Sequence, residues 1–205
     1  YAHANALEWG WRNVVLNDQW DVALVLDFDM FLLRTFSVSA MLAGHEIAGI
    51  QQSRGHVGYL WPGYVAIKRT LPDVDKLSWM CDAIEGENVD VGGRLYYWFK
   101  QHGTEKLHPL RHSPQIRRGD KSIELLPRQA RDEYCDEMNF VVAGPWLHYS
   151  NGTLWNPNSL NLQERKTALA AKIIEGCCSG ALALPNAELE SAEQERASNW
   201  EKGIS

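Results

Sequence analysis

The spacing of apolar and polar residues along the chain predicts helices and strands in alternation. Apolar residues recur at helical spacing over residues 4–15, which predicts an amphipathic helix followed by a polar turn. Residues 20–26, Trp-Asp-Val-Ala-Leu-Val-Leu, are almost continuously apolar, which is typical of a strand covered on both faces. This run is therefore predicted to be a central, parallel strand.

The same patterns continue to the end of the chain. Strands are predicted at residues 46–50, 63–67, 139–142 and 146–149, and a glycine- and aromatic-rich loop is expected at residues 54–62. Helices are predicted at residues 74–84, 91–103, 160–175 and 187–200. This alternation predicts an α/β fold with a mostly parallel sheet flanked by helices, in which ligands bind at the carboxyl ends of the strands.

Length and charge narrow the classes of protein that fit. A chain of 205 residues with 45% hydrophobic content can bury one substantial core, which we expect over residues 1–155, with a helical extension over residues 156–205. No apolar run approaches the roughly 20 residues that cross a bilayer, so no membrane span is expected. The net charge of −6 gives no general attraction to a phosphate backbone, so nucleic acid is not an expected partner.

The cysteines favour a reducing compartment. Cys81, Cys135, Cys177 and Cys178 show no Cys-x-x-Cys spacing, and adjacent cysteines such as the last two rarely pair with each other. We therefore expect structural thiols in a cytoplasmic protein. The chain opens inside a predicted helix and without an initiator methionine, which leaves room for a targeting signal or an earlier strand before it.

Two carboxylates follow the predicted central strand. Asp27 and Asp29 are separated only by Phe28, so in extended geometry both side chains leave the chain on the same side. Neighbouring carboxylates repel each other, and a divalent cation removes that cost. Oxygen ligands at this spacing suit Mg²⁺ or Mn²⁺, which in turn bridge phosphate oxygens. The alternative is that both aspartates cap the turn or helix that follows.

The residues around this pair resemble a known enzyme family. Residues 21–33, Asp-Val-Ala-Leu-Val-Leu-Asp-Phe-Asp-Met-Phe-Leu-Leu, are similar to the Asp-x-Asp region of GT-A glycosyltransferases, and residues 2–7 resemble the helix that precedes it. The resemblance covers about residues 1–155. It implies a Rossmann-like GT-A fold, with Asp29 as the most direct metal ligand and Asp27 in contact with the metal, the donor ribose or both.

A third metal ligand is implied by the same resemblance. Enzymes of the family often take a histidine from a strand near the end of the catalytic core, and residues 146–155, Trp-Leu-His-Tyr-Ser-Asn-Gly-Thr-Leu-Trp, are similar to that segment. His148 is therefore the candidate. A neutral imidazole nitrogen suits Mn²⁺ better than Mg²⁺. A hydrogen-bonded structural histidine is the alternative.

Four residues between these ligands are predicted to contact the nucleotide sugar. Residues 58–69 resemble the family's loop-then-strand segment beside the donor sugar, where Trp61 offers a flat apolar face and Gly63 allows close backbone approach. Gln51 and Arg54 follow a predicted strand and are expected to contact the sugar or the diphosphate. Packing in an aromatic core is the alternative for Trp61.

Asp90 is the candidate catalytic residue. With the Val-Gly-Gly-Arg-Leu that follows, it resembles the acidic residue that starts a helix and faces the acceptor in many GT-A enzymes. A carboxylate near the donor can take the proton of the acceptor hydroxyl as a general base, which an inverting enzyme needs. The alternative is that Asp90 caps the helix.

The resemblance implies a metal-dependent glycosyltransferase of the hexosyltransferase type. Its donor would be a UDP- or GDP-sugar, its cofactor Mn²⁺ or Mg²⁺, and its acceptor a carbohydrate or another hydroxyl compound. The family's opening strand and loop, which bind the nucleotide base, are expected to be reduced or to precede Tyr1. A non-catalytic carbohydrate-binding domain is one alternative, favoured by nine tryptophans. A HAD-like phosphohydrolase is another, although such enzymes usually have a small residue where this chain has Met30 and Phe31.

Overall fold

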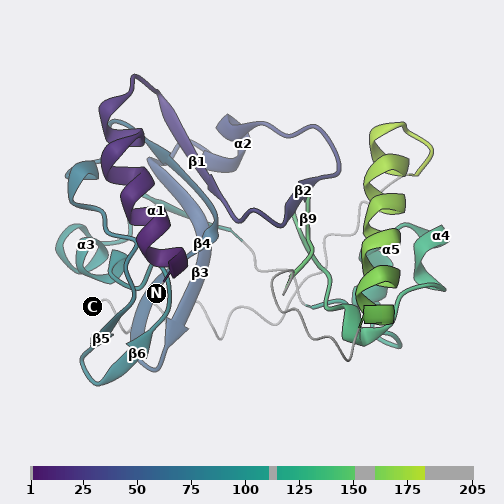
Figure 1. Cartoon of the computed structure of the whole chain (residues 1–205). Helices are drawn as coiled ribbons and strands as arrows, with labels where there is room; N and C mark the ends of the chain where they lie inside the picture. Colours follow the sequence, from purple (N-terminus) through teal and green to yellow (C-terminus); the bar gives the residue numbers. More distant parts are fainter. Residues whose placement is uncertain (1, 111–114, 151–159, 183–205) are drawn as a thin grey trace. The chain divides into compact units, whose positions relative to one another are not determined.

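The computed structural model describes residues 2–110, 115–150 and 160–182, which fall into two compact units (Figure 1). The first unit holds the described residues through Asp27 and those from Ser37 to Leu110. The second holds Phe28–Phe36 and the described residues from Gln115 to Leu182. The predicted boundary at residue 155 lies outside the described residues, so that division of the chain stays a prediction.

The first unit is built on a four-stranded sheet with the strand order β1-β4-β3-β7. Its strands are β1 (Val22–Leu26), β3 (Ile47–Arg54), β4 (Val57–Lys68) and β7 (Leu107–Leu110). β4 is antiparallel to both β1 and β3, and the β3–β7 pair is parallel. A separate antiparallel hairpin consists of β5 (Asp82–Ile84) and β6 (Glu87–Val89).

The prediction of a mostly parallel, Rossmann-like GT-A sheet is therefore wrong. Arg54 pairs with Val57, so only Gly55 and His56 join β3 to β4, and so short a link permits only an antiparallel pair. Gly55 supplies the positive φ of 53° that such a tight turn needs. β4 thus begins inside the stretch predicted as a loop. β1 is also misplaced by the prediction, because it lies at the edge of the sheet.

Helices cover this sheet. They are α1 (Ala2–Asn13), η1 (Val15–Asn17), α2 (Val38–Leu42), η2 (Val74–Lys76) and α3 (Leu95–His102). α1 lies beside the strands in Figure 1, and its buried Trp11 has its ring centroid 5.4 Å from that of Trp79 and 6.0 Å from that of Trp20. These aromatic rings pack with Ile47 and Val65 of the strands, so α1 closes the core of the first unit.

The helix predicted at residues 74–84 is wrong, because the chain forms only η2 there and then enters β5. Side chains of α1 account for the difference. The Glu8 carboxylate accepts a hydrogen bond from the Trp79 backbone N at 2.7 Å, and Arg12 Nη2 donates to the Leu77 carbonyl at 2.6 Å. These contacts come from an element far away in the sequence, so local periodicity carries no sign of them.

The second unit contains a three-stranded antiparallel sheet with the order β2-β9-β8. Its elements are β2 (Met30–Leu32), η3 (Lys121–Leu125), α4 (Arg128–Arg131), η4 (Asp136–Met138), β8 (Val141–Ala143), β9 (Trp146–His148) and α5 (Leu160–Cys178). α5 confirms the helix predicted at residues 160–175 and packs Leu169 and Ile173 into a core with Phe140 and Leu147. The helix predicted at residues 187–200 lies outside the described residues.

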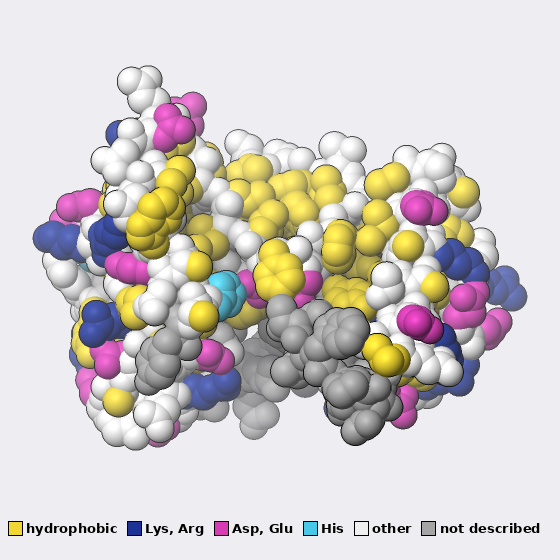
Figure 2. Space-filling view, in the orientation of Figure 1, with side chains coloured by type: hydrophobic (Ala, Val, Ile, Leu, Met, Phe, Trp, Pro, Cys, Tyr) yellow, Lys and Arg dark blue, Asp and Glu magenta, His cyan; other side chains and the backbone are white. Residues whose placement is uncertain are grey.

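The described residues show interspersed surface charge, no helix suited to a membrane, and free thiols. Figure 2 shows basic and acidic side chains interspersed on the face in view, without a continuous basic area. None of the helices in the described ranges has the length and apolar character needed to cross a bilayer. Cys81, Cys135, Cys177 and Cys178 are all free.

Replacing Tyr134 by Phe is expected to weaken the second unit and to change its response to alkali. The buried Tyr134 Oη donates to the Ile116 carbonyl at 2.7 Å, so its loss should cost about 1–2 kcal/mol at pH 7. Burial raises the pKa of Tyr134 to about 12. Because an unfolded tyrosine has a pKa of about 10, this group stabilises the fold fully below pH 10 and loses that contribution toward pH 12. Urea unfolding of both proteins from pH 7 to pH 11 should show a shallower alkaline decline in Tyr134→Phe, and equal slopes would contradict this.

Candidate metal centre

Asp29 and His148, far apart in the sequence, lie side by side in the second unit. Met30 of β2 pairs with His148 of β9, and the Asp29 carbonyl accepts a hydrogen bond from the Tyr149 backbone N at 2.9 Å. The His148 Nε2 is 3.3 Å from Asp29 Oδ1, and the two side chains are 16% and 12% exposed. An antiparallel strand pair therefore sets both side chains at the same position along the sheet.

The β2–β9 ladder continues into the turn that joins β8 to β9. Ala143 pairs with Trp146, so only Gly144 and Pro145 join β8 to β9, and Gly144 has a φ of 58°. The Pro145 carbonyl also accepts a hydrogen bond from the backbone N of Leu33 at 2.8 Å, just beyond β2. A slip of one residue in this pairing would turn His148 to the other face of the sheet. The β2–β9 register, which the Leu33–Pro145 hydrogen bond extends, thereby determines that His148 meets Asp29.

Asp27 stands at the end of β1, as predicted for a carboxylate that follows an apolar strand. Its backbone N donates to the Gly63 carbonyl at 3.1 Å, and its Oδ1 is 3.4 Å from the Nε2 of His3 in α1. The Asp27 side chain is 15% exposed. Since only Phe28 separates it from Asp29, the spacing of the two carboxylates is a local property of three consecutive residues.

Asp27, Asp29 and His148 meet the basic requirement for holding a metal ion. Their ligand atoms all lie within 4.8 Å of one another, and no other such group of three or more is found among the described residues. Oxygen ligands on opposite sides of an ion at about 2.1 Å are about 4.2 Å apart, so the group needs to close by only a fraction of an ångström. Two carboxylates and an imidazole form a donor set that suits Mn²⁺.

Trp61 and Gly63 occupy an irregularity of the first sheet. The pairing of β3 with β4 shifts between Gly49 and Gln51, and the extra residues of β4 at this point include Trp61 and Gly63. Pro62 fits between them because it has no N–H to donate to a ladder. Bulges of this kind redirect side chains and are frequent beside active sites. Gln51 of β3 is half-buried at the same irregularity.

Gly63 is the point at which this irregularity meets Asp27. A Cβ added to Gly63 would lie 2.1 Å from Cζ2 of Trp61 and 2.6 Å from Oδ2 of Asp27. No side chain fits in that space. The absence of a side chain at Gly63 thus lets the Trp61 ring and the Asp27 carboxylate lie close to the same stretch of backbone.

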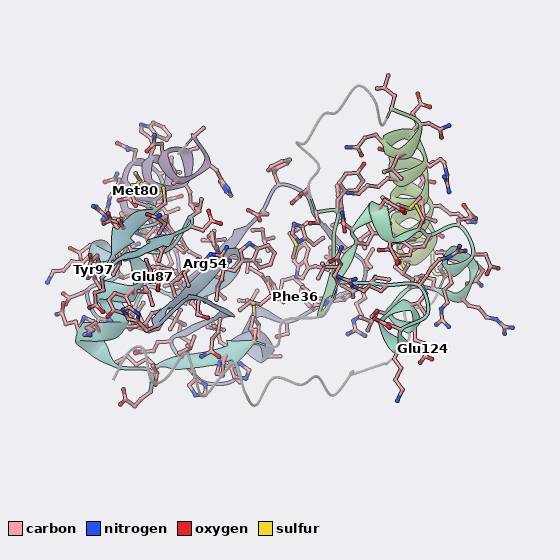
Figure 3. The ribbon with its side chains drawn as sticks, turned by 90° about the horizontal axis from the view of Figure 1, so that it is seen from below. Phe36, Arg54, Met80, Glu87, Tyr97 and Glu124 are labelled. Carbon is pink, nitrogen blue, oxygen red and sulfur yellow. The ribbon has the colours of Figure 1, made fainter. Side chains whose placement is uncertain are left out.

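Asp90 lies in the turn before α3 and contacts Arg54. Its Oδ2 is 3.7 Å from Nη2 of Arg54, which Figure 3 labels near the end of β3, and the Asp90 side chain is 62% exposed. The Asp90 Oδ1 accepts a hydrogen bond from its neighbour Val91 N at 3.0 Å. The residue at the cap position of α3 is Arg94, so the alternative role of Asp90 as the cap of this helix does not apply.

The turn after Asp90 packs on the irregular part of β4. Gly92 has a φ of 84°, and a Cβ there would lie 2.8 Å from the Leu60 carbonyl oxygen and 3.2 Å from Cδ of Pro62. The Asp90 backbone N also donates to the Tyr59 Oη at 3.4 Å. Asp90 and Asp27 are therefore both anchored to the β4 segment between Tyr59 and Gly63.

A histidine and a lysine near the ligands were missed by the sequence analysis. His3 contacts Asp27, and Lys166 of α5 is only 4% exposed although it carries a charge. A signal for Lys166 was present, because Leu169 and Ile173 follow it at helical spacing and place it on the apolar face of the helix. For His3 the sequence offers no comparable signal.

Similarity to known proteins does not identify this site. Comparison of this chain with protein-family models, with curated proteins and with solved structures gives no match.

Proposed function

We propose that this chain is a metal-dependent glycosyltransferase that transfers a sugar from a nucleotide-diphosphate sugar to an acceptor hydroxyl. The observation that carries the proposal is the convergence of Asp27, Asp29 and His148, with ligand atoms within 4.8 Å of one another. The sequence resemblance implies the same three residues as metal ligands.

Asp27, Asp29 and His148 would hold Mn²⁺ or Mg²⁺. A divalent cation bound there would neutralise negative charge that builds up on the departing nucleoside diphosphate. In the transfer, the bond between the anomeric carbon and the diphosphate oxygen breaks and a bond to the acceptor oxygen forms. By holding the cation, the three residues would set where the diphosphate leaving group binds.

The remaining predicted residues take roles in the first unit. Trp61, which is partly exposed, offers its ring to a sugar, and Gln51 offers an amide. Asp90 is exposed and is oriented by Arg54 at 3.7 Å, so its carboxylate is open to an acceptor hydroxyl and takes the proton that this hydroxyl loses. The free cysteines support the cytoplasm as the compartment.

A donor screen tests the proposal. The purified chain is incubated with UDP- and GDP-sugars, with Mn²⁺, with Mg²⁺ or with a chelator, and release of nucleoside diphosphate is followed with and without sugar acceptors. Release that needs a divalent cation is expected. Asp75→Asn is a suitable control, because this exposed aspartate lies in η2 and is not one of the candidate site residues.

Other outcomes separate the alternatives. Binding of free sugars without nucleotide binding, whatever the cation, would contradict the proposal and favour a carbohydrate-binding domain. Release of phosphate from a phosphomonoester would contradict it in favour of a phosphohydrolase. In that case Asp27 would be the expected nucleophile.

A further inference from the structure

Lys166 is a buried cation beside the candidate metal ligands. Its side chain, on α5, is only 4% exposed, and apart from Ser122 it is the one polar or charged residue in the buried class among the described residues. Burying an ammonium group is costly unless its surroundings compensate it. A charge kept at such a position therefore needs an explanation.

Aromatic rings and a carbonyl hold the ammonium in place. Lys166 Nζ lies 3.9 Å from the centroid of the Tyr149 ring and 5.7 Å from that of Phe140, and it donates to the Ser150 carbonyl. Rings of this kind attract a cation through their negative faces. Lys166 thus remains an ion in the core of the second unit, and no carboxylate of the described residues forms a hydrogen bond with it.

Tyr149 connects this cation to the metal ligands. Its backbone N donates to the Asp29 carbonyl at 2.9 Å, and it directly follows His148. Its Oη donates to Gln163 Oε1 at 3.1 Å and lies 3.0 Å from Thr167 Oγ1. Two residues of α5 therefore hold the Tyr149 hydroxyl, and the same helix places Lys166 near Asp29.

The charge of Asp29 acts on Lys166. Burial lowers the pKa of Lys166 to about 8, and the negative charge of Asp29 acts in the opposite direction. Lys166 is consequently a cation at neutral pH, and its field reaches the site. The carboxylates of Asp27 and Asp29 balance a divalent cation, so Lys166 leaves one positive charge uncompensated there.

We propose that Lys166 makes the Asp29–His148 site select a divalent cation that carries a diphosphate over the bare cation. This inference rests on the proposed function. The uncompensated charge opposes the binding of a bare cation and attracts the anionic diphosphate, so the site favours the cation and the diphosphate together over the cation alone. Lys166 is thereby a positioning charge for the leaving group, and the donor and the metal bind as a pair.

Two affinities of the Lys166→Met variant test the inference. Bare Mn²⁺ binding is measured from the EPR signal of the free ion, and UDP binding at saturating Mn²⁺ is measured by calorimetry. Loss of the charge is expected to tighten bare Mn²⁺ by about three- to tenfold and to weaken UDP by a similar factor. Lys172→Met, an exposed position on the same helix paired with Glu133, is the control and should change neither.

Opposite signs distinguish an electrostatic role from a structural one. If both affinities of Lys166→Met fall together, or if neither changes, the inference is wrong while the proposed function stands. Lys166→Gln, which keeps a donor for the Ser150 carbonyl, provides a second neutral variant should the first fail to fold. If the wild-type chain binds neither Mn²⁺ nor UDP or GDP, the proposed function fails together with the inference.

Discussion

Asp29→Asn is expected to lower the affinity for UDP in the presence of Mn²⁺ by about 100-fold or more, and to abolish metal-dependent release of nucleoside diphosphate. The asparagine side chain keeps the shape of the aspartate but loses the negative charge that a divalent cation requires. Changes in residues that only support a metal ligand already cost about 10- to 100-fold, so loss of a ligand should cost at least as much. Calorimetric titration of UDP into the Mn²⁺-loaded protein measures the effect.

Asp29→Asn is expected to remove the charge without disturbing the fold. Asp29 holds the β2–β9 pair through its backbone carbonyl, which accepts from Tyr149 N, and this contact is untouched in Asp29→Asn. The unfolding temperature should therefore stay close to that of the wild type, and Asp75→Asn should bind UDP normally. Unchanged Mn²⁺-dependent binding in Asp29→Asn would contradict the role given to this carboxylate.

Gly63→Ala is expected to weaken Mn²⁺-dependent nucleotide binding by about tenfold or more. The new methyl would lie 2.1 Å from the Trp61 ring and 2.6 Å from the Asp27 carboxylate, so both must move. A displacement of about 1 Å is enough to cost a catalytic or metal site much of its activity. The same titration measures the loss, and a shift in tryptophan fluorescence should accompany it.

Gly10→Ala is the matched control for this prediction. Gly10 lies in α1 and has open space where a Cβ would be added, so the substitution should leave nucleotide binding unchanged and stabilise the helix by about 0.5–1 kcal/mol. Equal binding by the wild type and Gly63→Ala would show that Asp27 does not need its present position.

The candidate site was more predictable than the fold around it. Asp27 and Asp29 follow an apolar strand, and their spacing along the chain is visible in the sequence. His148 was predicted only from a family resemblance, because its position beside Asp29 depends on the register of β2 with β9. That register is a property of pairing between distant segments, which residue types at one segment do not reveal.

The sheet was mispredicted because hydrophobicity does not encode strand direction. Residues 22–26 are apolar enough for a central strand, yet β1 lies at an edge, where its residues are half-buried with the help of α1 and the neighbouring core. The decisive signal was the Gly55–His56 turn, which forces β3 and β4 to be antiparallel. Residues 54–62 are rich in glycine and aromatic residues and were predicted to be a loop, which hid that turn.

The contacts of Lys166 and His3 were not predictable from the sequence, for a different reason. A lysine in a helix is ordinarily expected on the solvated face, and its burial here depends on the rings of Phe140 and Tyr149, which come from other elements. His3 meets Asp27 only because α1 packs on the core of the first unit. Both contacts arise from packing between distant elements, whereas the predicted ligands follow from local order along the chain.

Pulsed EPR of Mn²⁺ bound to the protein with UDP tests the central claim most directly. The account predicts one Mn²⁺ spectrum that shows both coupling to a directly bound imidazole nitrogen and coupling to diphosphate phosphorus, with the nitrogen coupling lost in His148→Gln. A spectrum identical to that of Mn²⁺ and UDP in buffer, or bound Mn²⁺ without nitrogen coupling, would contradict a metal centre formed by Asp27, Asp29 and His148.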